Sequence, residues 1–185
     1  MRCLITASIL LFSGLSLADD PADGMFGTRQ IKSLNTEQAR ELAKMPGEVL
    51  DLSGLKSIDQ SVASELACWS GRPGPGVHML VLKKRYVSMI LGLTSIDKSV
   101  AHELSCFFGD ELELNGLTTL DKDAATELAK FSGKLLLNGV KTLDKDSAYA
   151  LSKFQGTAIE LRGIKSLDAN SRSILIADRR IITTR

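Results

Sequence analysis

The stretch Gly116-Leu117-Thr118-Thr119-Leu120-Asp121 decides the fold, because the chain repeats it along most of its length. Its pattern of glycine, apolar residue, two variable residues, apolar residue and aspartate returns at 54–59, 92–97, 139–144 and 163–168, and a weaker copy ends at Asn35. The steps between the final Asp or Asn residues are 24, 38, 24, 23 and 24 residues. A recurring period of this length predicts a stack of structural repeats.

One repeat unit is clearest at residues 110–133. Apolar and polar residues alternate from Glu111 to Asn115, which predicts a short half-buried strand followed by a turn at Asn115-Gly116. Asp121 stands where a helix should begin, since its carboxylate can accept hydrogen bonds from the first turn. Gly133 is the expected end of that helix. Each unit is therefore predicted to be a strand, a turn and an Asp-capped helix.

Three positions of the predicted helices recur at fixed distances from the cap residue. The fourth is small and the seventh is leucine, as in Ala125 and Leu128. The tenth is large and mostly aromatic: Met45, Trp69, Phe107, Phe131 and Phe154. This spacing predicts an amphipathic helix that packs its small residue against the sheet and fills each layer with its large residue.

The segment Leu112-Glu113-Leu114-Asn115-Gly116-Leu117-Thr118-Thr119-Leu120 resembles the strand and turn of leucine-rich-repeat proteins, in the short variant of about 24 residues found in exported bacterial proteins. The resemblance covers most of residues 29–176 and implies an α/β solenoid, with a parallel sheet on its concave face and helices on its convex face. Gly116, Gly139 and Gly163 stand where the longer motif has a buried Asn. The resemblance therefore does not decide whether an asparagine ladder forms. Another α/β repeat fold is the alternative.

The N-terminal residues have the features of an export signal. Arg2 precedes an apolar run from Leu4 to Leu17, and Ser16-Leu17-Ala18 is a small-x-small cleavage site. We therefore expect a signal peptide at 1–18, a polar lead-in at 19–28 and a solenoid at 29–185. The apolar run is shorter than the ~20 residues that span a bilayer, so no transmembrane segment is expected in the mature chain. Periplasm, cell surface and medium all remain possible destinations.

Composition bears on the partner. Without residues 1–18 the chain has equal numbers of basic and acidic residues, because only Arg2 is lost from 23 basic and 22 acidic ones. A neutral chain with 5% aromatic residues argues against nucleic acid as a partner. Cys68 and Cys106 occupy equivalent positions in neighbouring repeats. Export permits a disulfide between them, but the helix spacing of ~8–10 Å argues against one.

The 38-residue step marks an insertion at about 71–92. It begins with a segment rich in Gly and Pro, followed by an apolar run at 77–82. A basic run at Lys83, Lys84 and Arg85 comes next. Residues 87–91 then predict the regular strand of the next repeat. The insertion is either an added strand without its helix or a protruding loop. The basic run is either a solvated loop edge or a clamp for an anionic glycan or lipid headgroup.

The sequence offers little catalytic chemistry. His78 and His102 are isolated, and no nucleophile, zinc or phosphate-loop motif occurs. The pairs Asp121/Asp123 and Asp144/Asp146 could suggest calcium, but helix capping accounts for them. We expect no enzyme, no metal and no cofactor. The rival hypothesis is acid–base work by Glu111 and Glu113, whose side chains share one face of a strand.

The concave sheet face is the candidate site. If the insertion keeps register, one row of outward side chains comprises Asp51, Met89, Glu113, Leu136 and Glu160. A flanking row comprises Ser53, Leu91, Asn115, Asn138 and Arg162. Acidic groups around a central apolar pair would suit a basic or mixed protein surface. The expected function is an exported binding module that recognises a protein or envelope component through these rows or the 71–92 insertion. The alternative is a structural envelope protein that associates with itself.

Overall fold

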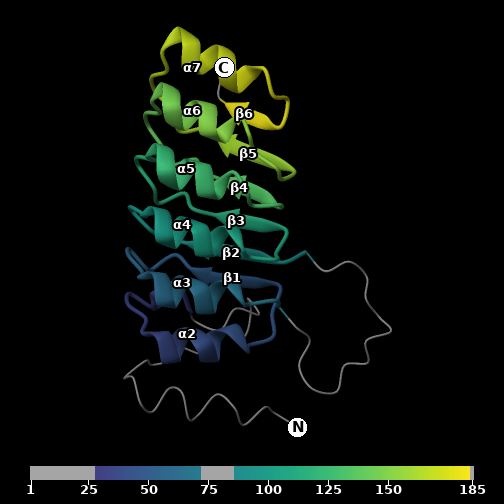
Figure 1. Cartoon of the computed structure of the whole chain (residues 1–185). Coiled ribbons are helices and arrows are strands. Elements are labelled where there is room, and N and C mark those ends of the chain that lie inside the picture. The colour runs from purple at the N-terminus through teal and green to yellow at the C-terminus, as the bar shows by residue number, and fades with distance from the viewer. Residues whose placement is uncertain (1–27, 72–85, 184–185) are drawn as a thin grey trace, which may run out of the picture.

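The protein forms a two-layer α/β structure in which strands and helices alternate (Figure 1). This computed structural model describes residues 28–71 and 86–183. Its parallel strands follow one another across a six-stranded sheet in chain order, without a crossover to a distant neighbour. They are β1 (Val49–Leu52), β2 (Ser88–Leu91), β3 (Glu111–Glu113), β4 (Lys134–Leu136), β5 (Ala158–Leu161) and β6 (Ile181–Thr183).

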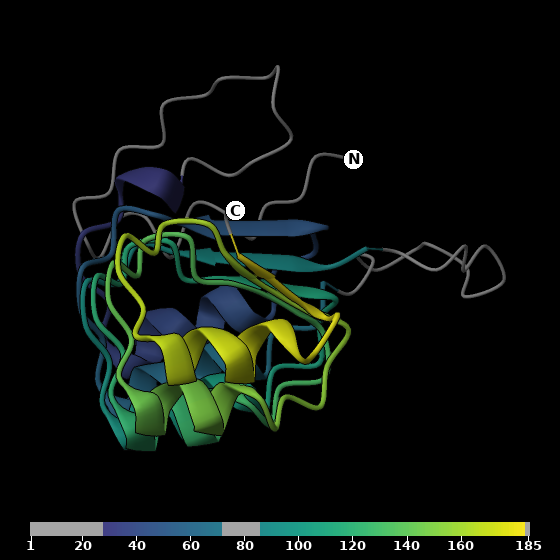
Figure 2. The ribbon, with the colours of Figure 1, turned by 90° about the horizontal axis from the view of Figure 1, so that it is seen from above.

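The helices α2 to α7 lie together on one side of this sheet (Figure 2). They are α2 (Thr36–Ala43), α3 (Gln60–Ala67), α4 (Lys98–Ser105), α5 (Lys122–Leu128), α6 (Lys145–Leu151) and α7 (Ala169–Ile176). A short 3-10 helix, η1 (Thr28–Gln30), precedes them and adjoins β1. The predicted alternation of strand and helix is therefore confirmed. The strand β6 forms the C-terminal edge of the sheet.

The cap residue fixes where each helix begins. Asn35 and the aspartates of the repeat have extended backbones, and each side chain accepts a hydrogen bond from the amide three residues later. For Asp121 the acceptor Oδ1 lies 2.8 Å from the Ala124 amide nitrogen. Because the first-turn amides have no partner within the helix, this bond satisfies a donor that would otherwise depend on water.

The core lies between the helices and the sheet. The recurring alanines at the fourth helical position are fully buried, and the recurring leucines at the seventh are at most 7% exposed. Three of the large side chains at the tenth position, Trp69, Phe107 and Phe131, stack from one repeat to the next. The ring centroids of Trp69 and Phe107 are 6.1 Å apart, and those of Phe107 and Phe131 are 6.2 Å apart. This column ties neighbouring layers together, as the sequence predicted.

The glycines act by close approach of the backbone, which corrects one expectation. Gly133 does not end α5, because that helix stops at Leu128 and Ala129 caps it. A Cβ on Gly133 would instead lie 2.6 Å from the Asp110 oxygen and 2.7 Å from Phe131 Cζ. The turn glycine Gly116 similarly faces carbonyl oxygens of the preceding repeat. Glycine is needed at both places because any side chain would push the layers apart.

Cys68 and Cys106 are both exposed and unbridged, one at the C-cap of α3 and one at the C-cap of α4. The strand expected at 87–91 is present as β2. The predicted signal peptide and nearly all of the lead-in, together with the 77–82 strand and the basic run Lys83, Lys84 and Arg85, lie outside the described residues. Among the described helices, none is long and apolar enough to cross a membrane.

Candidate binding surface on the sheet

The candidate site is the outer sheet face, meaning the face opposite helices α2–α7. Strand register places one residue of each strand in a central row across this face. In order from β1 to β6 the row comprises Asp51, Ile90, Glu113, Leu136, Glu160 and Ile182. Acidic and aliphatic side chains therefore alternate strictly from strand to strand, at the ~4.8 Å spacing of a sheet.

Two residues of the predicted rows are wrong. Met89 pairs in register with Leu50 and Leu112 and is fully buried in the core, and Leu91 is likewise buried. The reason is a one-residue deletion in the turn, since Leu91-Gly92-Leu93 lacks the residue that Asn115 supplies between Leu114 and Gly116. Because side chains alternate along a strand, this shift exchanges the two faces. Ile90 takes the outward position instead.

Asp51 forms the N-terminal end of the row and is 3% exposed. Arg29 Nε donates to its Oδ2, and the Ser53 amide donates to its Oδ1 at 2.9 Å. Burial tends to raise the pKa of Asp51, but the bonds from Ser53 and Arg29 outweigh burial, and the pKa lies below its ordinary value. Asp51 is therefore a charged group that anchors η1 to the sheet.

Glu113 lies at the centre of the row, between Ile90 and Leu136. Asn115 Nδ2 donates to Glu113 Oε1 at 2.7 Å. The Oδ1 of Asn115 accepts from the Asn138 amide at 2.8 Å, and Asn138 Oδ1 accepts from the Arg162 amide at 2.9 Å. The flanking row thus contains a short asparagine ladder just past the strand ends. It holds the Asn115 amide, a neutral donor, in place on the Glu113 carboxylate.

Glu160 is paired with cations on both sides. Lys134 Nζ lies 2.7 Å from Glu160 Oε1, and Arg162 Nε lies 3.0 Å from Glu160 Oε2. The hydrogen bond from Lys134 holds the pKa of Glu160 below its ordinary value, and the same bond raises the pKa of Lys134. Lys134 also reaches Glu111 Oε2 at 3.5 Å.

Tyr86 donates to the same Glu111 oxygen at 2.8 Å, so four charged groups and a phenol form one network on strands β2 to β5 and their flanks. Partial burial and the Glu111 carboxylate together raise the pKa of Tyr86 to about 12. Tyr86 therefore stays a hydrogen-bond donor at any physiological pH.

Lys134, Tyr86 and Glu111 are absent from the predicted rows. Of the three, the sequence analysis names only Glu111, in the enzyme hypothesis. Alignment of the strands from their first residue would have found Lys134, since it pairs in register with Glu111. Tyr86 lies within the predicted insertion at 71–92, where the repeat spacing gives no guide. The other predicted row residues come together on or beside the outer sheet face: Asp51, Ser53, Glu113, Leu136, Glu160, Asn115, Asn138 and Arg162.

The polar side chains described in the helix layer cap helices or pair with one another. Asp121 and Asp144 use an oxygen each to cap α5 and α6, and the Ser147 amide lowers the pKa of Asp144. His102 Nδ1 lies 2.9 Å from Glu127 Oε2 on the next helix. Within residues 28–71 and 86–183, no three His, Cys, Asp or Glu side chains form a group that could hold a metal ion.

Comparison of the chain with protein-family models, with curated proteins and with solved structures finds no match. The geometry of this sheet face and the repeat pattern therefore support the function proposed below.

Proposed function

We propose that this chain is an exported leucine-rich-repeat-like solenoid that binds another protein, or another component of the cell envelope, through its outer sheet face and without catalysis. The observation that supports this is the central row, in which three carboxylates alternate with three aliphatic side chains across six strands. The apolar run and cleavage pattern at 1–18 support export.

Glu113 is the residue on which we expect binding to depend most. Asp51 and Glu160 are each paired with an arginine or lysine, whereas the bond described at Glu113 comes from the neutral Asn115 amide. A carboxylate with a neutral donor retains its full charge for an incoming cation. Ile90 beside it is half-buried and offers apolar contact, whereas Leu136 on its other side is only 8% exposed. The partner should therefore present a lysine or arginine beside an aliphatic or aromatic side chain.

The test is a charge reversal at this position. Glu113→Lys should abolish capture of a partner that the wild-type protein retains from envelope extract, and the loss should appear again as at least a tenfold weaker Kd with the purified partner. The matched control is Asp123→Lys, which reverses an exposed charge on α5 in the helix layer. If both variants bind as the wild type does, the outer sheet face is not the binding surface.

A structural role through self-association is the second candidate. The observation that favours it is the incomplete cover at the C-terminal end of the stack, where Ile176 is 63% exposed. This role does not require the outer sheet face to bind anything.

A further inference from the structure

The last repeat ends in an exposed surface that no further repeat covers within the described residues. We define the C-terminal end face by Ile164, Leu167, Arg172, Ile176 and Thr183, which line one shallow pocket there. In the four inner repeats the counterparts of Ile164 are fully buried: Leu55, Leu93, Leu117 and Val140. Ile164 itself is only half-buried.

Contacts between the helices show which side of each helix faces the next repeat. Arg40 Nη2 of α2 lies 2.8 Å from Glu65 Oε1 of α3, and His102 of α4 bonds Glu127 of α5 in the same way. The donors are the fifth residue after the cap and the acceptors the sixth. Residues one, five and eight after a cap therefore share the side that faces forward, towards the C-terminal end.

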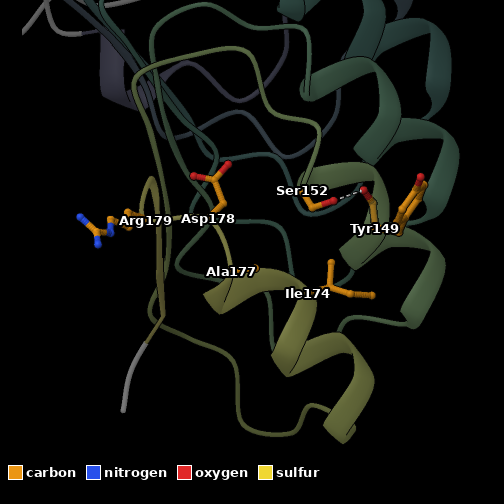
Figure 3. A pocket seen from close by; sticks show the side chains of 6 residues that line it. All are labelled: Tyr149, Ser152, Ile174, Ala177, Asp178 and Arg179. Carbon is orange, nitrogen blue, oxygen red and sulfur yellow. Dashed lines mark hydrogen bonds between the residues drawn. The ribbon is translucent and has the colours of Figure 1, made fainter.

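In α7 the eighth position after the cap is Ile176. Other repeats have the small residues Ala67, Ala129 and Ser152 there, so a large apolar group on the forward side is particular to the last repeat. The groove behind α7 is also changed, because Tyr149 and Ile174 replace the ion pairs found between earlier helices (Figure 3). Within the described residues, α7 thus presents apolar surface that no further layer buries.

The two ends of the stack differ in charge. Lys165 and Arg172 are exposed at the C-terminal end face. At the other end, Glu41 is the sixth residue after the α2 cap and faces away from α3, and Glu37, four residues earlier, lies on the same stripe with its side chain 74% exposed. Lys44 bonds Glu41, and Arg40 reaches Glu37 only at 3.4 Å.

We propose that the C-terminal end face docks on the N-terminal end of a second copy of this chain, so that α7 packs beside α2 of the next copy and the repeat stack continues. Such docking buries Ile164 and Ile176 and places Arg172 and Lys165 opposite Glu37 and Glu41. Two C-terminal ends would instead bring basic groups together. A head-to-tail contact of this kind does not close on itself, so it generates chains of copies. It leaves the outer sheet face open, and it rests on the self-association role given above as the second candidate, not on the proposed binding function.

The test measures molar mass by light scattering or sedimentation across a wide concentration range, with the protein purified after export. The wild-type mass should rise continuously with concentration. Ile176→Lys blocks the C-terminal end, and the double variant Glu37→Lys/Glu41→Lys blocks the other end, so each alone should remain monomeric. An equimolar mixture should form a species of two chains and nothing larger, because one intact end of each kind remains. This mixture also shows that both variants are folded.

The matched control is Phe108→Lys, which changes a 94% exposed apolar residue in the middle of the stack and should associate as the wild type does. A wild-type mass that stays monomeric overturns the proposal. So does equal loss of association in Phe108→Lys, which would mean non-specific contact. Association that Ile176→Lys removes and the double variant retains would mean a symmetric contact between C-terminal ends and would also overturn it. If Ile176→Lys does not fold, Arg172→Glu replaces it with the same expected outcomes.

Discussion

Lys134 Nζ, at the start of β4, lies 2.7 Å from Glu160 Oε1 on β5 and 3.5 Å from Glu111 Oε2 on β3. One cation thus links three adjacent strands on the sheet face opposite helices α2–α7. Its side chain is about one-third exposed, and the two carboxylates are 12% and 16% exposed. Part of the charge in this network is therefore removed from water, and its loss should be measurable.

Lys134→Met should lower the free energy of unfolding by about 1–2 kcal/mol, because two partly buried carboxylates lose their shared donor. Urea denaturation followed by circular dichroism measures this. Lys141→Met, which removes an exposed lysine in a turn, should change the value by less than about 0.5 kcal/mol. Equal effects of the two variants would show that the network contributes nothing specific.

Acid should destabilise the protein through Glu160. Its folded-state pKa is lowered by Lys134, so the folded state binds fewer protons than the unfolded state near the ordinary pKa of 4.5. The resulting stability is present above that value and is lost as the pH falls through the folded-state pKa. The free energy of unfolding should therefore fall from about pH 6 to about pH 3.

Glu160→Gln should be less stable than the wild type at neutral pH, and the two curves should converge in acid. A constant difference between Glu160→Gln and the wild type across this pH range would contradict the linkage.

Repeat counting predicted most of this fold because each level of the sequence agrees with the others. Asp121 marks a helix start, Leu112 and Leu114 mark a strand, and the 23- or 24-residue period fixes the order in which they stack. Local capping chemistry and core periodicity determine these features, and both are visible in a single sequence. The alternation that buries Leu135 and exposes Lys134 follows from the same rule.

The errors occurred where stacking geometry, rather than local pattern, decides. The shorter turn at Gly92 places Met89 in the core, a shift that spacing counted from the cap residue does not show and that the strand register does. The helix after Asp121 was expected to end at Gly133, but that glycine instead accommodates the Phe131 ring and the preceding backbone. Such contacts depend on the distance between neighbouring repeats, which the local sequence of one repeat does not determine.

The turn glycines should be the positions least tolerant of a single added methyl group. A Cβ on Gly116 would lie 2.5 Å from the Leu93 oxygen and 2.6 Å from the Gly92 oxygen, both of them backbone atoms that cannot rotate away. Gly116→Ala should therefore destabilise the fold by about 1–3 kcal/mol through overpacking. Thermal denaturation measures the effect.

Gly47→Ala is the matched control, because the nearest atoms to its added Cβ lie at 3.6 and 3.7 Å, which is ordinary contact. It should be neutral to within about 0.5 kcal/mol. A Gly116→Ala variant as stable as Gly47→Ala would mean that the layers can separate more easily than this packing implies.

The exposed thiols give a test of the helix layer. Cys68 and Cys106 cap neighbouring helices and are not joined. Both should react with iodoacetamide in the native protein, as measured by mass spectrometry of their peptides, and a reductant should leave the melting temperature unchanged. Protection of both thiols together, reversed by reductant, would show that a bridge forms.

The aromatic column should carry the largest share of stability at any single position. Phe131 is fully buried, its ring stacks on Phe107 in the preceding repeat, and its Cζ packs against the backbone of Gly133. Phe131→Ala should lower the free energy of unfolding by about 3–5 kcal/mol, because it removes apolar burial and leaves a cavity that backbone on one side and a ring on the other cannot fill.

Phe108→Ala is the control. It makes the same chemical change one residue after Phe107, at a side chain that is 94% exposed, and should be neutral to within about 0.5 kcal/mol. Equilibrium urea denaturation of both variants measures the contrast. Since each repeat contacts mainly its neighbours, a second transition in Phe131→Ala would mean that the column couples the two halves of the stack. If the two variants unfold at the same urea concentration, the rings do not hold the layers together.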